Sequence, residues 1–253
     1  MPALNAERYI DDAIASVVAQ SHNSWELIIV DDGSNDSTVE KVDRWRDKDT
    51  RIRLMTNESS LGIGGACNRG ASSAATDLIA RLDADDLMAP DRLATQVSFL
   101  NSHPDVVLCG SWANIVGPAG EHWGVFDPPI DDTQIRRMML RDNPFVHSSV
   151  MFRREAFLSV GGYGLGMWED YELWVKLSRC GSVEIIPLPL VSHRRHGSSY
   201  SSGTDRTRSR LRRLAFQVAA ARANRQILRA AWPVARSLTA ALLRLPYKDE
   251  LQR

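Results

Sequence analysis

Residues 78–86 read LIARLDADD, an apolar run that ends in three aspartates packed within four positions. The run is short and β-rich, which is typical of a buried strand that opens into a polar turn. A second stretch repeats the pattern, because residues 25–30 are apolar and β-rich and end at Asp31 and Asp32. In open α/β sheets ligands lie beyond the carboxyl ends of strands, so we expect both acidic turns to face one crevice.

Strand and helix patterns alternate around these two turns. Apolar residues recur at helical spacing in 10–20, 39–45, 93–100 and 135–139, and short β-rich runs occur at 51–54 and 106–109. The glycine-rich stretch 62–65 predicts a loop ahead of a helix that contains Asn68 and Arg69. The alternation predicts a layered α/β sheet.

Composition limits the class of protein. The chain has 253 residues, of which 43% are hydrophobic and 25% charged, as in a soluble globular protein with one domain or one domain and an appendage. No apolar run approaches the roughly 20 residues that a membrane-spanning helix needs. The three cysteines have no paired spacing. We therefore expect a cytoplasmic protein without disulfides.

The net charge of zero hides an uneven distribution. Residues 194–253 contain 14 Lys and Arg against 3 Asp and Glu, whereas residues 1–193 contain 17 against 28. Apolar residues at helical spacing after residue 211 predict that the basic segment is helical. Its charge favours either docking on the acidic body or attraction to anionic lipid or nucleic acid.

The carboxylates of Asp83, Asp85 and Asp86 point to a cation. Like charges crowded together cost stability unless a cation or solvent compensates them. Their oxygens suit magnesium or manganese, which complete their coordination with water and substrate phosphates, as when a diphosphate is held. The alternative is a solvated acidic turn ahead of a helix, whose dipole favours aspartate.

Three further polar segments each have a functional and a structural interpretation. Asp31 and Asp32 either bind a nucleobase together with turn amides or form an ordinary strand-to-helix turn. Glu169 and Asp170 lie beside aromatic residues at a predicted helix start, where an apolar wall raises a carboxylate pKa towards that of a general base. The alternative there is attraction to the helix dipole. Residues 193–199 either cover a diphosphate with arginine and histidine side chains or form a solvated basic loop.

Taken in order, these segments resemble family 2 glycosyltransferases of the GT-A fold. The matching stretches are 1–3, 5–9, 25–34, 68–70, 81–86, 90–93, 147–154, 161–163 and 169–170, followed by Arg194 and His196. Members of that family transfer sugars from nucleotide donors with inversion. The resemblance implies a GT-A domain over 1–202, with a Rossmann-like mixed sheet flanked by helices, and a basic helical extension over 203–253.

The resemblance also implies roles for single residues. Asp170 would be the general base that removes the acceptor proton, with Glu169 orienting it. Asp85 would be the direct ligand of Mn²⁺ or Mg²⁺, with Asp83, Asp86 and His196 as further metal candidates. The residues expected at the nucleotide sugar are Asp31, Asp32, Asn68, Arg69, Arg81, Asp83 and Arg194. Cys67 departs from the pattern, because many relatives carry arginine at its position. One contact with the nucleotide-sugar donor is therefore left unassigned.

A second departure concerns the first strand. Relatives carry an apolar strand directly before the segment that matches residues 1–3, and in their sheet that strand is central. Here only its last residues are present, and a missing central strand would leave unpaired backbone groups on both neighbours. The hypothesis that follows is that the natural chain starts upstream of Met1 or that this is a truncated form.

The resemblance implies transfer of a sugar from a UDP- or dTDP-sugar to a glycan or lipid-linked acceptor in cell-surface polysaccharide synthesis. Residues 204–253 are expected to contact the anionic inner face of the membrane, with a solvated or dimer-forming helix as the alternative; nucleic acid is not an expected partner. Two other functions remain open: a non-catalytic nucleotide-sugar-binding or assembly protein, and a sugar-phosphate nucleotidyltransferase, which would carry a glycine-rich basic loop where this chain has residues 5–8. Residues 62–65 lack the spacing of a dinucleotide-binding motif, which disfavours an oxidoreductase.

Overall fold

The computed structural model describes residues 1–166, 168–196 and 218. Apart from residue 218, the predicted basic extension over 203–253 and its expected membrane contact lie outside these residues. No helix in the described residues is long and apolar enough to span a membrane.

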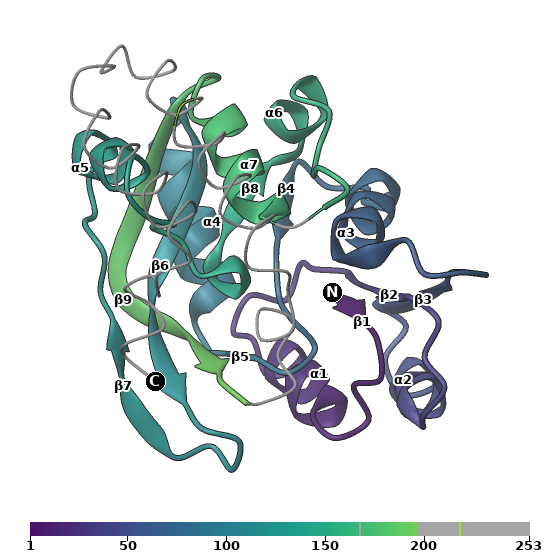
Figure 1. The fold of residues 1–253 in the computed structure, drawn as a ribbon. Coiled ribbons are helices and arrows are strands. Elements are labelled where there is room, and N and C mark those ends of the chain that lie inside the picture. The colour runs from purple at the N-terminus through teal and green to yellow at the C-terminus, as the bar shows by residue number, and fades with distance from the viewer. Residues whose placement is uncertain (167, 197–217, 219–253) are drawn as a thin grey trace, which may run out of the picture.

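The strands of the described residues form two sheets (Figure 1). The first is parallel, in the order β1 (Pro2–Ala3), β2 (Leu27–Asp31) and β3 (Ile52–Thr56). The second has the order β4-β8-β6-β9-β5, with β7 paired to β6, and it is mixed because β6 and β9 are parallel while its other pairs are antiparallel. Its strands are β4 (Leu78–Ala80), β5 (Leu87–Met88), β6 (Val106–Val116), β7 (His122–Phe126), β8 (Met151–Arg153) and β9 (Ser182–Arg194). The expected mixed α/β sheet is confirmed.

Helices connect and cover these strands. They are α1 (Ile10–Val18), α2 (Thr38–Arg46), α3 (Gly62–Ser73), α4 (Arg92–Ser102), α5 (Asp132–Met138), α6 (Arg154–Ser159) and α7 (Glu169–Leu177), with a 3₁₀ turn at His147–Ser149. The helices predicted over 10–20, 39–45, 93–100 and 135–139 are confirmed as α1, α2, α4 and α5.

Two apolar clusters make up most of the core. In the first, Ile10 and Ile14 of α1 pack in one cluster with Ile29 of β2 and Leu82 after β4, so this cluster joins the two sheets. The second surrounds Trp174, which is fully buried on α7, and includes residues of β6, β8 and β9. Burying an aromatic side chain of this size contributes strongly to stability. Helix α7 is therefore held firmly against the second sheet.

The glycine-rich stretch 62–65 is not a loop, as its composition predicted, but the first turn of α3. Two backbone N–H groups at this helix start, those of Leu61 and Gly62, donate to the Asp32 carboxylate, which satisfies groups that a helix end leaves without partners. A methyl group on Gly64 would lie 2.2 Å from the Gly164 carbonyl oxygen and 3.5 Å from Cβ of Glu169. The glycines thus allow the start of α3 to approach the start of α7 closely.

Strand β1 is short, as the sequence predicted. Pro2 pairs with Val30 and Ala3 with Asp31 on β2. Among the described residues no strand pairs with the other edge of β1, and β4 is the end strand of the second sheet on its path. The two sheets are therefore held together by their shared apolar core rather than by a strand between them.

Candidate active site

The acidic turn follows directly after β4. Arg81 donates from Nη2 to Oδ1 of Asp83 at 2.6 Å, and the Ser148 hydroxyl donates to Oδ2 of Asp83 at 2.9 Å. Burial favours the neutral acid, but the Arg81 charge together with the hydrogen bonds from Arg81 and Ser148 opposes it, and the pKa of Asp83 lies well below its usual range. Asp83 is therefore a carboxylate at any physiological pH.

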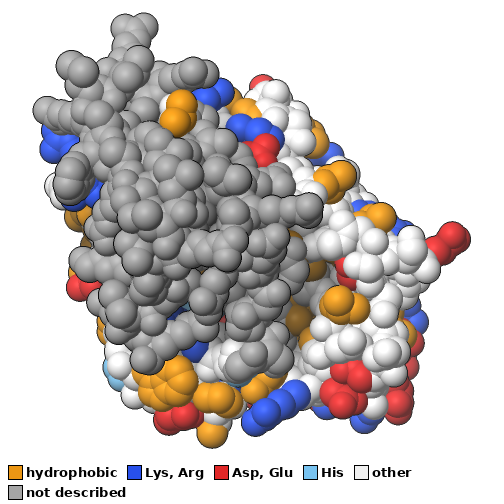
Figure 2. Space-filling model, viewed as in Figure 1, with side chains coloured by type: hydrophobic (Ala, Val, Ile, Leu, Met, Phe, Trp, Pro, Cys, Tyr) orange, Lys and Arg blue, Asp and Glu red, His pale blue; other side chains and the backbone are white. Residues whose placement is uncertain are grey.

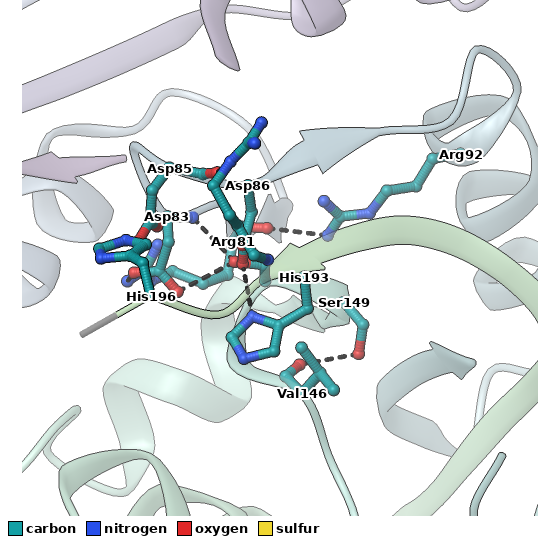
Figure 3. Close-up of polar contacts among 11 residues, drawn as sticks. Arg81, Asp83, Asp85, Asp86, Arg92, Val146, Ser149, His193 and His196 are labelled. Carbon is teal, nitrogen blue, oxygen red and sulfur yellow. Dashed lines mark hydrogen bonds and ion pairs between the residues drawn. The ribbon is translucent and has the colours of Figure 1, made fainter. Parts of the chain in front are cut away.

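Asp85 and Asp86 differ sharply in their surroundings (Figure 3). Burial, and then the charges of Asp83 and Asp86, raise the pKa of Asp85 to about 6, while His196 lies with Nε2 2.9 Å from its Oδ2. Asp86 is fully buried; its Oδ1 accepts from the Arg194 backbone N–H at 2.7 Å and its Oδ2 lies 3.0 Å from Nδ1 of His193. Asp86 thus ties the turn to the end of β9, and Asp85 is the more accessible of the two carboxylates.

Arg194 is 5% exposed, and its guanidinium donates to backbone carbonyls. Nε donates to the Asp85 carbonyl at 3.0 Å and Nη1 to that of Pro118 at 3.1 Å, and the guanidinium lies over the Tyr9 ring at 4.6 Å from its centre. These contacts fix the backbone of the acidic turn. The predicted contact of Arg194 with a nucleotide sugar stays a prediction.

The two carboxylates at the end of β2, Asp31 and Asp32, also accept hydrogen bonds. Asp32 accepts hydrogen bonds from Asn57 Nδ2, Ser60 Oγ and the two amides at the start of α3 at 2.6 to 2.9 Å, and these bonds outweigh burial and lower its pKa. Asp31 accepts from the Gly33 and Ser34 amides with Oδ2, while its buried Oδ1 has no partner within the described part of the chain. The resemblance to the family implies a base contact for Asp32; in the structure the unpaired buried oxygen is that of Asp31.

Asn68 and Arg69 hold neighbouring segments in place. The Asn68 amide exchanges two hydrogen bonds with the backbone of Tyr163, at 3.0 and 2.8 Å, and so joins α3 to the segment before α7. Arg69 donates to the Thr56 carbonyl at 2.6 Å and also contacts Oδ1 of Asn57. Their expected contacts with a donor sugar stay predictions.

Two of the three carboxylates in the first turn of α7, those of Glu169 and Asp170, have unlike environments. Asp170 accepts from Asn143 Nδ2 at 2.7 Å, and burial raises its pKa. Glu169 is 5% exposed with Oε2 unpaired in the described chain, and burial, followed by the charge of Asp170, raises its pKa to about 7. Burial thus raises the pKa of both groups, which is the direction that favours a general base near neutral pH.

One segment, residues 143–149, connects Asp170 with Asp83, and no role was predicted for its residues. Asn143 binds Asp170 and Ser148 binds Asp83. Between them, His147 places Nε2 2.9 Å from the Tyr163 hydroxyl, and burial, then Arg81, lowers the pKa of His147 to about 3. This histidine is therefore neutral. Polar residues beside the apolar stretch 150–152 were the available signal, but only their contacts identify what they hold.

The donor atoms around Asp85 suit a divalent cation. A carboxylate and an imidazole face each other at Asp85 and His196, and Mn²⁺ or Mg²⁺ in such sites takes only one or two protein carboxylates alongside phosphate oxygens. The described residues contain no preassembled cluster of three or more ligands. The residues present therefore fit an ion that shares its coordination with a bound diphosphate.

The arrangement of strands and helices matches known structures. Residues of this chain superpose on S. aureus TarS 1-349 in complex with UDP-GlcNAc with a TM-score of 0.75 at 18% identity, covering 94% of this chain and 70% of that one. Mannosyltransferase PcManGT from Pyrobaculum calidifontis, in complex with GDP-Man and Mn²⁺, matches with a TM-score of 0.65 at 19% identity, covering 97% and 74%. The fold is thus the GT-A fold of glycosyltransferases.

Comparison of sequences identifies the family of this chain. Residues 1–161 match the family model described as glycosyl transferase family 2, and the chain belongs to this family. The putative glycosyltransferase EpsE of Bacillus subtilis is 32% identical over 70% of this chain and 64% of its own length. The amylovoran biosynthesis glycosyltransferase AmsE of Erwinia amylovora is 30% identical over 68% of this chain and 65% of its own length. The chain therefore spans just under two thirds of these relatives.

Proposed function

We propose that this chain is an inverting glycosyltransferase that moves a sugar from a UDP- or dTDP-sugar to a glycan or lipid-linked acceptor in cell-surface polysaccharide synthesis. Relatives named for amylovoran and O-antigen biosynthesis support the pathway class. Complexes of fold neighbours with UDP-GlcNAc and GDP-Man support a nucleotide-sugar donor.

The observation that carries the proposal is the Asp170 carboxylate. It lies at the first turn of α7, is held by Asn143, and has a pKa raised by burial. A carboxylate of this kind removes the proton of an acceptor hydroxyl as that oxygen attacks the anomeric carbon. The leaving diphosphate departs from the opposite face, so one base suffices and the anomeric configuration inverts. Glu169, the neighbouring buried carboxylate, supports or orients the base.

Asp83 and Asp85 would hold the donor diphosphate together with Mn²⁺ or Mg²⁺. Asp85 is the proposed direct ligand, with His196 facing it, whereas Asp86 is the weaker candidate because both of its oxygens already have partners. When bound, such an ion neutralises charge on the leaving nucleoside diphosphate. The further proposed donor contacts are Asp31, Asp32, Asn68, Arg69, Arg81 and Arg194.

Substitution of the base tests this proposal. Asp170→Asn should lower kcat for sugar transfer by about 100-fold or more, the usual contribution of a general base, while the Kd for UDP changes little. The control is Asp12→Asn, a matched change at an exposed site on α1. Wild-type levels of transfer in Asp170→Asn would exclude this residue as the base. Wild-type protein that binds UDP with manganese but neither hydrolyses nor transfers any sugar would instead support the non-catalytic binding protein.

We further propose a cytoplasmic protein that touches the inner face of the membrane through residues 204–253. The supporting observation is the excess of 14 basic over 3 acidic residues in 194–253. Clusters of basic residues are attracted to anionic lipid surfaces. Sedimentation with phosphatidylglycerol vesicles, but not with neutral phosphatidylcholine vesicles, is the expected result; equal sedimentation with both would contradict the proposal.

A further inference from the structure

The aromatic ring of Tyr9 lies against two residues that contact the acidic turn, although Tyr9 itself directly precedes α1. The ring centre is 4.6 Å from the guanidinium carbon of Arg194. It is 5.2 Å from the centre of the His196 ring, with the two ring planes inclined by 32°. No role was predicted for Tyr9. Because it is far from both residues along the chain, only the fold brings the three side chains together.

Both neighbours of the Tyr9 ring bind Asp85. Arg194 donates from Nε to the Asp85 carbonyl at 3.0 Å and so fixes the backbone of the turn. His196 faces the Asp85 carboxylate, with Nε2 2.9 Å from Oδ2 (Figure 3). A shift of either neighbour would therefore displace the carboxylate that is the proposed direct ligand of a cation. Residues that orient metal ligands in this way commonly change metal affinity when they are replaced.

The ring of Tyr9 is well suited to hold Arg194. The guanidinium is shielded from water, since Arg194 is 5% exposed, and a cation–π contact is stronger when the cation is desolvated. The Tyr9 hydroxyl is buried and has no hydrogen-bond partner within the described part of the chain. The contact thus depends on the aromatic ring rather than on the hydroxyl.

The segment that carries Tyr9 is itself firmly held. Five hydrogen bonds of 2.8 to 3.1 Å join residues 5–7 to residues 34–38. One pair is reciprocal, because the Glu7 N–H donates to the Asp36 carboxylate while the Glu7 carboxylate accepts from the Ser37 N–H. The Tyr9 N–H then donates to the Ala6 carbonyl at 3.0 Å. Tyr9 is therefore presented from a segment whose backbone is fixed on both sides of Ala6.

We propose that Tyr9 is a positioning residue of the cation site, whose ring holds Arg194 and His196 in place beside Asp85. This inference rests on the proposed function, from which it takes the cation at Asp85. Tyr9 acts through its two neighbours and supplies no ligand of its own. Loss of the ring should therefore weaken cation binding while every proposed ligand is still present.

The test measures the Kd for Mn²⁺ of the full chain in the presence of UDP, from the electron paramagnetic resonance signal of free Mn²⁺. Tyr9→Leu should raise this Kd about tenfold or more, as expected for loss of a residue that orients metal ligands. Tyr9→Phe keeps the ring, so its Kd should stay within about twofold of wild type. An unchanged Kd in Tyr9→Leu would overturn the proposal, and an equal rise in both variants would overturn the role of the ring.

The matched control is Phe99→Leu on α4. This change also removes a half-buried ring that stacks on a histidine, because Phe99 and His103 have ring centres 4.3 Å apart. Any general loss of stability should resemble that of Tyr9→Leu, but the Kd for Mn²⁺ should equal that of wild type. A rise in the Phe99→Leu Kd as large as that in Tyr9→Leu would show a general effect of destabilisation and would overturn the positioning role.

A second measurement without metal separates this inference from the proposed function. The Arg194 backbone N–H donates to Asp86, and its hydrogen exchange should be about tenfold faster in Tyr9→Leu but not in Tyr9→Phe. If the wild-type chain with UDP binds no Mn²⁺, the cation of the proposed function is wrong, whereas this exchange still reports on Tyr9. Exchange at the wild-type rate in Tyr9→Leu would overturn the claim that the ring holds Arg194.

Discussion

Glu169 is a buried carboxylate on α7 whose charge is poorly compensated. Its pKa of about 7 in the folded protein exceeds the ordinary value of 4.5. Between these two pH values the folded state binds more protons than the unfolded chain, so the contribution of Glu169 to stability is greatest below pH 4.5 and falls as pH rises through about 7. At about 1.4 kcal/mol per pKa unit, the loss amounts to about 3 kcal/mol.

Glu169→Gln should remove this loss. Urea unfolding at several pH values should show the variant gaining about 3 kcal/mol relative to wild type as pH rises from below 4.5 to above 7. Glu155→Gln, at an exposed position on α6, is the matched control and should show no comparable gain. A difference between Glu169→Gln and wild type that stays constant with pH would contradict this explanation.

Asn143 is a positioning residue in the proposed reaction. Its hydrogen bond to Asp170 favours the charged carboxylate, so Asn143→Ala should raise the pKa of Asp170 further. The acidic limb of the kcat profile should move to higher pH, and activity should recover at high pH with the donor KM unchanged.

The control for Asn143 is Asn101→Ala, at an exposed position on α4. A purely structural role for Asn143 predicts a different pattern, in which kcat falls equally at all pH values. An unshifted pH profile in Asn143→Ala would therefore reject the positioning role even if activity were reduced.

At the scale of elements, the start of α3, which Asp32 binds, lies close to the start of α7, which carries Asp170. Gly64 lets the start of α3 meet the segment before α7. Gly64→Ala should destabilise the fold by about 1–3 kcal/mol, because its methyl group would clash with a backbone carbonyl 2.2 Å away.

Gly70→Ala is the control within the same helix. A methyl group there would meet Cγ2 of Val30 at 3.2 Å, a side-chain atom that can shift, and alanine gains up to about 1 kcal/mol in helix propensity. Urea unfolding should therefore show Gly70→Ala close to wild type and Gly64→Ala clearly weaker. Equal stability of the two variants would show that α3 does not depend on this close approach.

Across the whole molecule, donor binding should couple to global unfolding. A ligand at 100 times its Kd stabilises the folded state by about 2.7 kcal/mol, which corresponds to a rise in Tm of about 5–10 °C for a chain of this size. UDP with manganese should produce such a shift, and UDP alone a smaller one. Asp85→Asn should lose the part that depends on manganese, while an unchanged manganese effect in that variant would remove Asp85 as the proposed ligand.

Figure 2 shows the molecule from the same direction as Figure 1. On the surface of the described residues that is visible there, charged side chains are scattered. Around the acidic turn, in contrast, Arg81, Asp86 and Arg194 are each at most 5% exposed. Electrostatic interactions are stronger where water is excluded. Burial raises the pKa of both Asp83 and Asp85, but the Arg81 guanidinium opposes this at Asp83, whereas the charges of Asp83 and Asp86 add to it at Asp85. The two pKa values therefore move in opposite directions although the carboxylates are close in sequence.

The amino-acid sequence predicted the alternation of strands and helices, the acidic turns at strand ends, and the family. The elements and turns depend on short-range patterns, such as apolar spacing and the run of aspartates after Leu82. The family followed instead from the resemblance of the ordered motifs. The loop predicted at 62–65 was wrong because its helical first turn depends on a carboxylate 30 residues away, that of Asp32.

The partners of the candidate site residues emerged only from the folded chain. Asn143 reaches Asp170 across 27 residues, Ser148 reaches Asp83 across 65, and Asp86 binds the Arg194 amide across 108. No local pattern encodes such pairs, because they form where separate elements pack together.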